Sequence, residues 1–253
     1  MKEILALIPA RSGSKSVVDK NIRMIGGKPM LAHSIDHAKA SKYITRTIVS
    51  TDSEKYAAIA REYGAQTPFI RPAEYATDTA LDIDVFEHAL NFLKENEGYE
   101  PELVVQLRPT YPIRRVDDID GMIEIMLSDE TIDSMRCITA ADEIPYKMWR
   151  IGSMIGPDTA GAGENSRGKE YAIIDPLMTD ISECYNMPRQ QLPRVYYQNA
   201  CIDVIRTRVI TDMHSMSGRK IAGYIMHEYF DIDTEEEFKK AEEEIGKLKS
   251  PKL

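Results

Sequence analysis

The chain lacks the features of membrane-embedded and disulfide-rich proteins. In its 253 residues no apolar run approaches the ~20 residues that a membrane helix needs, so we predict no membrane partner. It has three cysteines, Cys137, Cys184 and Cys201, an odd number without the spacing of a metal site. Free thiols are typical of a reducing compartment, and the chain begins with a strand pattern instead of a signal peptide. We therefore predict a cytoplasmic protein.

Positive charge is in deficit over the chain as a whole. Lysine and arginine number 32 against 41 aspartate and glutamate residues, which gives a net charge of −9. This balance argues against a broad nucleic-acid-binding surface, so no nucleic-acid partner is predicted. It leaves room for one small anionic ligand in one basic pocket.

Two glycine motifs of nucleotide-binding proteins are also absent. The chain has neither the G-x-x-x-x-G-K-[ST] loop of simple P-loop kinases nor the G-x-G-x-x-G loop of simple dehydrogenases. An NAD-dependent oxidoreductase stays open only as a distant alternative, because Asp52 follows the second predicted strand and could serve as the ribose-binding acid.

Strand and helix patterns alternate along the first half of the chain. Short apolar runs predict strands at Ile4–Ile8, Thr45–Ser50, Leu103–Leu107 and Ser134–Thr139. Amphipathic stretches between them predict helices, one of them over Val116–Leu127. This order favours an α/β fold with a mostly parallel, doubly wound (Rossmann-like) sheet that carries helices on both faces.

The pattern becomes irregular over residues 140–195, which carry five prolines and five glycines. We interpret them as an arm inserted into a single domain of residues 1–253, with 157–170 as its tip. Regular patterns return at Ala200–Ile205 and Ile221–Met226. Capping boxes are predicted at Thr79 with Asp82 and at Thr234 with Glu237, the latter opening a last helix.

A cluster of cations follows the first strand. Residues 11–28 include five basic side chains and one acid, Asp19, in a chain that is acidic overall. The cations are Arg11, Lys15, Lys20, Arg23 and Lys28. Ser12, Gly13 and Ser14 would let backbone N–H groups approach phosphate oxygens, so the segment reads as a triphosphate cradle. A solvated β–α loop that happens to be basic is the other interpretation.

Two further groups of residues carry chemistry. Asp231 and Asp233 stand two residues apart at a predicted strand end, a spacing that suits Mg²⁺, although a surface acid and a helix N-terminal acid explain the same pattern. Arg71, followed by Thr77-Asp78-Thr79, could hold a ribose or a base edge. Arg108 ends the central strand, where open α/β sheets bind ligands. Arg114 and Arg115 are expected to be a solvated helix start.

Together these pieces resemble the acylneuraminate cytidylyltransferase family, the CMP–sialic acid and related nonulosonate synthetases, over nearly the whole chain. The order and spacing of the matching segments are specific, although each segment alone is weak. They are Ile8–Lys15, Lys20-Asn21, Ile48–Asp52, Arg71–Glu74, Asp78–Ala80, Pro109–Arg114, Pro188–Pro193 and Asp231–Thr234.

The resemblance implies a nucleotidyltransferase-type fold and a reaction in which CTP and an acidic sugar give a CMP-sugar, for cell-surface glycans, and pyrophosphate. It implies catalytic roles for Arg11, Lys15, Asp231 and Asp233, with the two aspartates as ligands of Mg²⁺. The residues that it assigns to the nucleotide are Ala10, Arg11, Ser14, Lys15, Lys20, Asn21, Arg71, Asp78, Thr79 and Ala80.

The sugar half departs from the family pattern. Sialic acid synthetases typically have Gln-Pro-Thr-Ser-Pro where this chain has Arg108-Pro109-Thr110-Tyr111-Pro112, and Arg-Pro-Asn-Gly near Tyr197–Ala200. We hypothesise that Arg108 binds the anionic group of a different sugar. The resemblance further implies that the arm crosses to a second subunit of a homodimer. The predicted sugar-site residues are Arg108, Lys147, Arg189, Tyr197 and Asn199.

The mechanism follows from charge. The sugar hydroxyl attacks the α-phosphorus in line, and cations at the developing negative oxygens stabilise the transition state. No histidine or lone carboxylate stands out as general base, so we expect a metal-bound or water-relayed deprotonation. Two alternatives remain open: a nucleotidyltransferase that uses a sugar 1-phosphate, and a nucleotide-binding module without catalysis.

Overall fold

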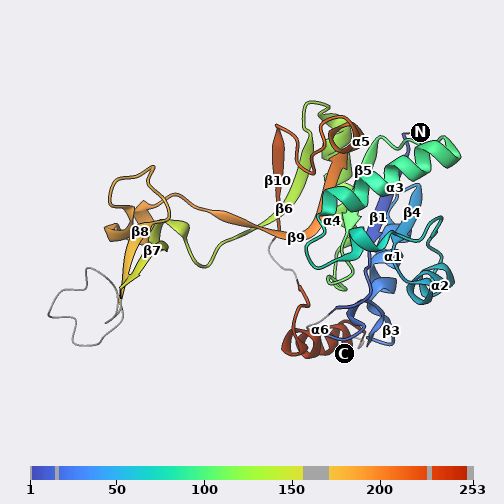
Figure 1. The fold of residues 1–253 in the computed structure, drawn as a ribbon, viewed down its shortest axis with the longest axis horizontal. Coiled ribbons are helices and arrows are strands. Elements are labelled where there is room, and N and C mark those ends of the chain that lie inside the picture. Colours follow the sequence, from blue (N-terminus) through green and yellow to red (C-terminus); the bar gives the residue numbers. More distant parts are fainter. Residues whose placement is uncertain (1, 15–16, 156–170, 227–229, 250–253) are drawn as a thin grey trace. The chain divides into compact units, whose positions relative to one another are not determined.

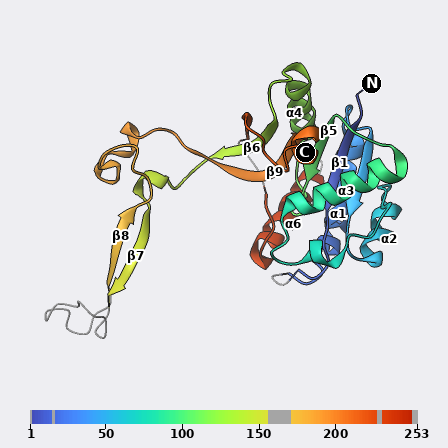
Figure 2. The ribbon, with the colours of Figure 1, turned by 45° about the horizontal axis from the view of Figure 1, so that its top comes forward.

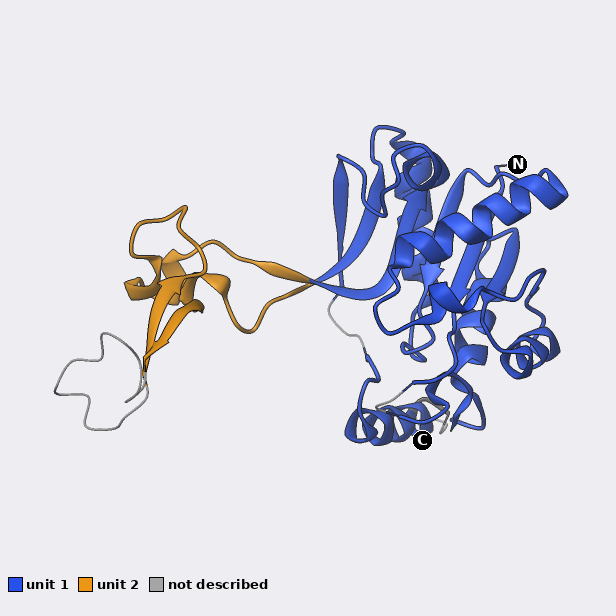
Figure 3. Ribbon diagram, viewed as in Figure 1, with its two compact units in different colours: residues 1–138, 198–253 blue, residues 139–197 orange. Residues whose placement is uncertain are grey.

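The computed structural model describes residues 2–14, 17–155, 171–226 and 230–249. The chain divides into two compact units, one formed by residues 1–138 with 198–253 and the other by residues 139–197 (Figure 3). The predicted arm, 140–195, falls inside the second unit. Its predicted tip, 157–170, lies outside the described residues, and so does Lys15.

The first unit is built on a six-stranded sheet with the strand order β10-β6-β9-β5-β1-β4 (Figure 1). Its strands are β1 (Ile4–Pro9), β4 (Arg46–Ser50), β5 (Leu103–Leu107), β6 (Ser134–Ala140), β9 (Tyr196–Arg206) and β10 (Ile221–Ile225). β1 runs parallel to β4 and β5, and β10 runs parallel to β6, whereas β9 runs antiparallel to β5. The predicted mostly parallel α/β sheet is confirmed.

Helices cover both faces of this sheet (Figure 2). Successive strand side chains point to opposite faces, so Ile4 and Ile8 of β1 pack with one set of helices while Leu5 and Leu7 pack with the other. The first set is α1 (Met30–Ala40), α2 (Glu54–Glu62) and α4 (Val116–Ser128), and the second is α3 (Asp82–Glu97) and α5 (Thr207–Thr211). Each helix thus buries one apolar stripe.

The last helix, α6 (Glu235–Lys249), packs against the beginning of the chain. Its residues Phe238, Ala241 and Ile245 form an apolar cluster with the β2 (Met24–Ile25) and β3 (Lys28–Pro29) hairpin region. Gly26 has a left-handed backbone, and a Cβ there would lie 2.4 Å from Ile245 Cγ2, so the contact requires glycine. This packing brings the carboxyl-terminal segment beside the loop that follows β1.

One predicted capping box is confirmed and the other is wrong. Thr234 Oγ1 accepts from the Glu237 N–H at 3.2 Å, and Glu237 Oε2 accepts from the Thr234 N–H at 2.9 Å. At the other site α3 begins at Asp82 with Leu81 in the cap position, and Thr79 lies in the exposed turn before it. The polar run Thr77–Thr79 forms this turn instead of the first helical residues.

The second unit has little core of its own. An antiparallel hairpin of β7 (Trp149–Ile155) and β8 (Tyr171–Pro176) accompanies three short 3₁₀ helices, η3 (Pro145–Lys147), η4 (Cys184–Asn186) and η5 (Arg189–Gln191). Its fully formed core consists of Tyr146, Cys184 and Leu192. Within the described residues of both units, no helix combines the length and apolar character needed to cross a membrane.

Candidate active site

The loop that follows β1 is fastened to the end of β4. The Ser12 N–H donates to Asp52 Oδ1 and the Ser12 hydroxyl donates to Asp52 Oδ2, both at 2.7 Å. Burial works against ionisation of Asp52, but these two hydrogen bonds hold its pKa below the usual value. Asn21 Nδ2 donates to the Arg11 carbonyl at 2.9 Å and closes the other side of the loop. Both carboxylate oxygens of Asp52 therefore fix the loop at Ser12, which does not support the ribose-binding role of the oxidoreductase alternative.

A pocket of about 240 Å³ opens beyond the carboxyl ends of β1 and β5. Most of the predicted nucleotide residues line it. Its walls are formed by Pro9, Arg11, Ser14, Lys20, Asn21, Arg71, Tyr75, Thr77, Asp78, Ala80, Asp82, Val85, Arg108, Pro109 and Thr110. Ala10 is buried beneath the loop, with its N–H bonded to the Ser50 carbonyl at 2.9 Å, and Thr79 does not line the wall. Four basic side chains face two acidic ones around this pocket.

Arg71 is the least satisfied charge in the pocket wall. The residue is only 4% exposed, and its Nε and Nη2 atoms have no hydrogen-bond partner among the described residues. Burial lowers the pKa of Arg71, while nearby Asp52 opposes this effect. A buried donor without an acceptor is costly, so a ligand oxygen or nitrogen that accepts from Arg71 would recover that cost.

The other arginines of the pocket have carboxylate partners. Arg11 Nη1 lies 2.7 Å from Asp78 Oδ1, in the turn before α3. Arg108 Nη2 lies 2.7 Å from Asp82 Oδ2, and its Nη1 lies 3.0 Å from Asp203 Oδ2. An incoming polyanion would therefore compete with two aspartates for these cations, in addition to finding Arg71.

The two ends of the chain meet at this pocket. Lys20 Nζ, in the short 3₁₀ helix η1 (Lys20–Ile22), lies 2.7 Å from Asp233 Oδ1. The Ile232 N–H donates to the carbonyl of Thr110, another residue of the pocket wall, at 3.1 Å. The hydrophobic packing of α6 on the β2–β3 region explains why residues so distant in sequence come together.

Asp231 has a more enclosed position than Asp233. Its Oδ2 lies 2.8 Å from the Tyr111 hydroxyl, and its Oδ1 is buried without a hydrogen-bond partner among the described residues. Burial raises the pKa of Asp231, the Tyr111 hydrogen bond opposes this, and the charge of Asp233 adds to the rise. The segment is not part of a strand, contrary to the prediction, but Ile232 is still buried between the two acids.

The aspartate pair fits a hard divalent cation. An orphaned, buried carboxylate oxygen on Asp231 is the type of ligand that Mg²⁺ prefers, and it stands next to a second carboxylate. Among the described residues no group of three or more His, Cys, Asp or Glu could hold a metal. A magnesium ion here would thus take its remaining ligands from water and from phosphate oxygens, as such ions usually do.

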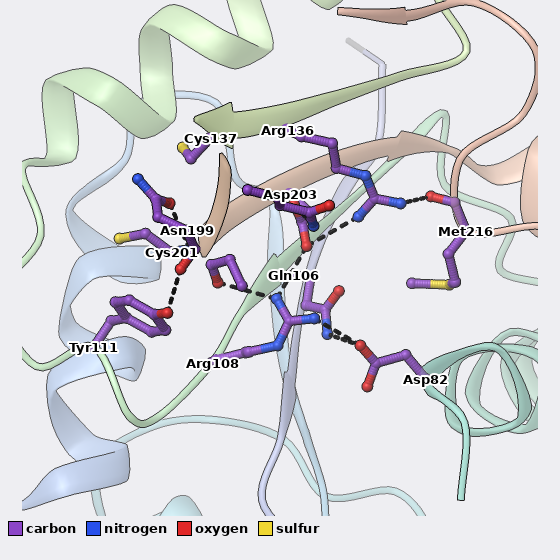
Figure 4. A network of polar contacts seen from close by, with 12 residues as sticks. Asp82, Gln106, Arg108, Tyr111, Arg136, Cys137, Asn199, Cys201, Asp203 and Met216 are labelled. Carbon is purple, nitrogen blue, oxygen red and sulfur yellow. Dashed lines mark hydrogen bonds and ion pairs between the residues drawn. The ribbon is translucent and has the colours of Figure 1, made fainter. Parts of the chain in front are cut away.

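Arg108 belongs to a buried polar network (Figure 4). Asp203 on β9 is fully buried and lies between Arg108 and Arg136, with the Arg136 Nη1 to Asp203 Oδ2 distance at 2.9 Å. Burial alone would lower the pKa of Arg108, but Asp82 and Asp203 raise it above its usual value. Arg108 is therefore a permanently charged residue held at the pocket wall by two acids.

The prediction that Arg114 is solvated is wrong. The residue is 7% exposed, and its guanidinium donates to the Cys201 carbonyl at 2.9 Å, to Ser34 Oγ at 2.8 Å and to the Arg108 carbonyl. It ties the loop after β5 to α1 and β9. Arg115 is exposed at the cap position of α4, as expected for a helix start.

The sequence of this chain matches a known family. The family described as Cytidylyltransferase matches residues 5–145, which include β1, its loop, Arg71 and the loop after β5. The chain belongs to the cytidylyltransferase family. It is a nucleotidyltransferase, and the recognition of an acylneuraminate cytidylyltransferase-like chain is confirmed.

Two curated relatives extend the match. A CMP-N,N'-diacetyllegionaminic acid synthase of Campylobacter jejuni is 30% identical over 243 residues, covering 94% of this chain and 93% of the relative. An N-acylneuraminate cytidylyltransferase of Escherichia coli is 39% identical over 138 residues, covering 54% of this chain but 31% of that protein. The first similarity therefore includes both compact units.

Solved structures support the fold. The chain resembles a CMP:2-keto-3-deoxy-manno-octonic acid synthetase complexed with CTP, with a TM-score of 0.68 at 16% identity over 97% of this chain and 99% of that one. At this level of identity the similarity shows the architecture, which is that of a nucleotidyltransferase.

The remaining predicted sugar residues of this cytidylyltransferase fall in different units. Lys147 and Arg189 belong to the second unit, where Lys147 Nζ donates to the Tyr185 carbonyl at 3.0 Å and Arg189 lies 3.2 Å from Glu143. Tyr197 is the last residue of that unit and is exposed. Asn199 lies in the first unit, buried beside Tyr111. Their roles stay predictions.

Sequence reasoning missed three residues that shape the site. Asp82 was predicted only as part of a capping box, Asp52 was considered as a ribose-binding acid only in the oxidoreductase alternative, and Tyr111 was noted only as a departure from the family pattern. The signals available were the position of Asp52 just after a strand end and the replacement of a small residue by Tyr111 in the loop after β5.

Proposed function

We propose that this cytidylyltransferase joins CMP from CTP to an acidic, nonulosonate-like sugar and releases pyrophosphate in a Mg²⁺-dependent reaction. The observation that carries the proposal is the buried guanidinium of Arg71, whose Nε and Nη2 have no partner among the described residues, in a basic pocket that also meets the Asp231–Asp233 segment. Such a donor needs a ligand acceptor, and the other cations beside it suit the phosphates of a nucleoside triphosphate.

Different residues of the pocket would bind different parts of the nucleotide. Arg11, Ser14 and the loop amides would take the triphosphate, together with Lys15. Lys20, Asn21, Arg71 and the Asp78–Ala80 turn, with Thr79 at its exposed side, would take the ribose and cytosine. The loop held by Asp52 supports this division, because a fixed backbone loses less entropy when it binds phosphate.

The reaction is a displacement at phosphorus. The oxygen of the sugar hydroxyl forms a bond to the α-phosphorus, the bond from the α-phosphorus to the bridging β-oxygen breaks, and pyrophosphate leaves with that electron pair. The hydroxyl proton passes to water. Arg11 and Lys15 would neutralise charge on the triphosphate, and Mg²⁺ held by Asp231 and Asp233 would supply Lewis-acid stabilisation of phosphate oxygens.

The sugar is proposed to be acidic because the pocket offers a further cation beside the nucleotide residues. Arg108 lines the wall, and binding of a sugar carboxylate there would require it to leave Asp82 while Asp203 still holds its other side. The full-length similarity to an enzyme named for legionaminic acid supports the same class of sugar. The sugar-binding roles that the family resemblance assigns to Lys147, Arg189, Tyr197 and Asn199 remain part of the proposal.

A homodimer and a cytoplasmic location are further parts of the proposal. The β7–β8 hairpin exposes large apolar residues, among them Trp149, Ile151 and Ile173, at 43%, 66% and 51% exposure. A second copy of the chain is the partner that would cover them, since exposed apolar clusters mark interaction sites. All three cysteines are free and buried, which suits a reducing compartment.

The test is a substrate screen that reads pyrophosphate. The protein is incubated with Mg²⁺, each nucleoside triphosphate and a panel of 3-deoxy nonulosonic acids, 3-deoxy octulosonic acids and sugar 1-phosphates. We expect pyrophosphate only with CTP and an acidic keto sugar, and a product in which one phosphate joins cytidine to the sugar. The Asp231→Asn variant serves as the control that retains the fold.

Two other results would replace the proposal. A product with a diphosphate link would assign the protein to enzymes that use sugar 1-phosphates. Tight CTP binding without pyrophosphate release for any acceptor would make it a nucleotide-binding module.

A further inference from the structure

The loop after β5 contains a tyrosine that joins two distant parts of the first unit. Tyr111 is 2% exposed, and its hydroxyl contacts both the Asn199 carbonyl and Asp231 Oδ2, the latter at 2.8 Å. Figure 4 shows the tyrosine ring lying against the chain at Asn199 and Cys201. A single hydroxyl hydrogen thus serves two acceptors, one on β9 and one on the proposed metal ligand.

The backbone of β9 is shaped to present this acceptor. Ala200 has a φ of 59°, a left-handed conformation that is unfavourable for a residue with a Cβ. The consequence is that two successive carbonyls are used: that of Asn199 accepts from Tyr111, and that of Ala200 accepts from Arg108 Nη1 at 3.0 Å. Asn199 Oδ1 accepts from the Cys201 N–H at 3.1 Å and closes the turn. Local strain is retained where it fixes two side chains of the site.

The loop after β5 holds the aspartate segment through Tyr111 and Thr110. The Tyr111 hydroxyl contacts Asp231, the Thr110 carbonyl accepts from the Ile232 N–H at 3.1 Å, and the Thr110 side chain adds a hydrogen bond to Asp231. With Oδ2 occupied in this way, Oδ1 is the carboxylate oxygen left buried without a partner among the described residues. A carboxylate that binds a metal through one oxygen is typically oriented by a hydrogen bond to its other oxygen, and Asp231 has this arrangement.

We propose that Tyr111 is a positioning residue for Asp231: its hydroxyl, anchored on the Asn199 carbonyl, fixes Oδ2 so that Oδ1 can bind the divalent cation. The inference rests on the proposed function, since it takes Asp231 as a metal ligand. It assigns to Tyr111 a purpose beyond packing, because phenylalanine would fill the same space without holding the carboxylate.

The experiment measures metal affinity directly. Mn²⁺ is titrated into the wild-type protein and into Tyr111→Phe with CTP present and no sugar, and free Mn²⁺ is followed by electron paramagnetic resonance. Loss of an outer hydrogen bond to a metal ligand weakens binding by about 10- to 100-fold, and this is the expected change. CTP affinity in EDTA should remain within about twofold, which also reports that the variant is folded.

A matched control removes a tyrosine–aspartate hydrogen bond elsewhere in the same unit. Tyr224→Phe deletes a hydroxyl that donates to Asp118 at 3.2 Å, between β10 and α4. It should leave Mn²⁺ affinity unchanged, which separates a specific role of Tyr111 from a general loss of hydrogen bonding.

Two outcomes overturn the inference, and they are distinguishable. If Tyr111→Phe binds Mn²⁺ like the wild type while Asp231→Asn loses it, the aspartate binds metal and the tyrosine does not position it. If Asp231→Asn itself binds Mn²⁺ like the wild type, the metal site of the proposed function fails, and the inference fails with it.

Discussion

The two compact units of this cytidylyltransferase differ in how much apolar surface they bury. The first unit encloses a six-stranded sheet between helices, and two of its pocket arginines, Arg11 and Arg108, are paired with aspartates. Among the described residues, the second unit has a core of three buried side chains, and most residues of its hairpin are exposed. The first unit buries its own apolar surface, whereas the exposed apolar side chains of the second unit are the basis of the proposed homodimer.

The comparison assigns different measurements to the two units. Substitutions in the first unit should change nucleotide binding or stability, and substitutions in the hairpin should change association between copies. All five histidines belong to the first unit, because none lies within residues 139–197. Acid sensitivity from histidine is therefore expected in the first unit alone.

The largest effect is expected from Arg71→Met. Loss of the Arg71 guanidinium should weaken CTP binding by at least about 100-fold, since buried hydrogen bonds to charged groups contribute about 1.5–3 kcal/mol each. The same change removes a desolvated cation without partners at Nε and Nη2, so the free energy of unfolding should rise by about 1 kcal/mol. Calorimetric titration and thermal unfolding measure the two effects.

The control for this prediction is Arg189→Met in the second unit, which should leave CTP affinity unchanged. A fall in stability of Arg71→Met together with unchanged CTP binding would mean that Arg71 is a structural residue, and the contrast between the units would lose its main support.

The next effect concerns the hairpin. Ile151→Asp introduces a charge on a side chain that is 66% exposed in the single chain, and burial of that charge between two copies would weaken association by about 10-fold or more. Analytical ultracentrifugation over a range of concentrations measures the change. Ile221→Asp, on β10 of the first unit and 54% exposed, is the matched control that should not alter association.

A monomeric wild-type protein at all concentrations would contradict the hairpin prediction outright. The exposed apolar residues of the second unit would then belong to contacts other than self-association.

A smaller effect, on the stability of the first unit, is expected at acid pH. Burial, followed by the charge of Arg114, lowers the pKa of His37 to about 3, below the usual value of 6.5. Above pH 6.5 the His37 imidazole is neutral in both the folded and the unfolded state. Below pH 6.5 it is protonated in the unfolded state but stays neutral in the folded state. Stability is therefore lost as the pH falls from 6.5, by about 1–2 kcal/mol at pH 5.

The variant that checks this is His37→Gln, compared with wild type by urea unfolding at pH 7 and pH 5. The variant should lose less stability between the two pH values. Equal losses would show that His37 becomes protonated in the folded protein.

The smallest effect is expected from Ala200→Gly. Glycine accepts the left-handed backbone without the Cβ penalty of about 1–2 kcal/mol, while its greater freedom in the unfolded chain costs about 0.5–1 kcal/mol. Net stability should rise by up to about 1 kcal/mol in thermal unfolding. Ala222→Gly, on β10 without a positive φ, should instead lose about 0.5–1 kcal/mol, and a loss at both positions would show that Ala200 is not strained.

Local patterns predicted the regular parts of this fold. The strand Leu103–Leu107 has the bounds that its apolar run indicated, and Thr234 with Glu237 caps the last helix as their spacing required. The failures come from long-range contacts. Arg114 is buried because Cys201, Ser34 and the Arg108 carbonyl receive its donors, and none of these partners is adjacent in sequence.

The candidate site shows the same division. The basic composition of the loop after the first strand predicted Lys20, a cation beside a hydroxyl-rich turn predicted Arg71, and the paired aspartates predicted Asp233, although their segment is not a strand end. The tie between Tyr111 and Asp231 could not be predicted, since it depends on the left-handed turn at Ala200 and on how α6 packs near the amino-terminal hairpin. Patterns of one chain segment carry no information about such three-way contacts.

The central claim is that the basic loop near the amino terminus and the aspartates near the carboxyl terminus form one site for Mg²⁺ and CTP. The most direct test is calorimetric titration of CTP, with Mg²⁺ and in EDTA, into the wild type and into Asp231→Asn and Asp233→Asn. We predict that Mg²⁺ tightens CTP binding in the wild type and that this tightening disappears in both variants, whose CTP affinity in EDTA is no weaker. Undiminished tightening by Mg²⁺ in both variants would contradict the claim.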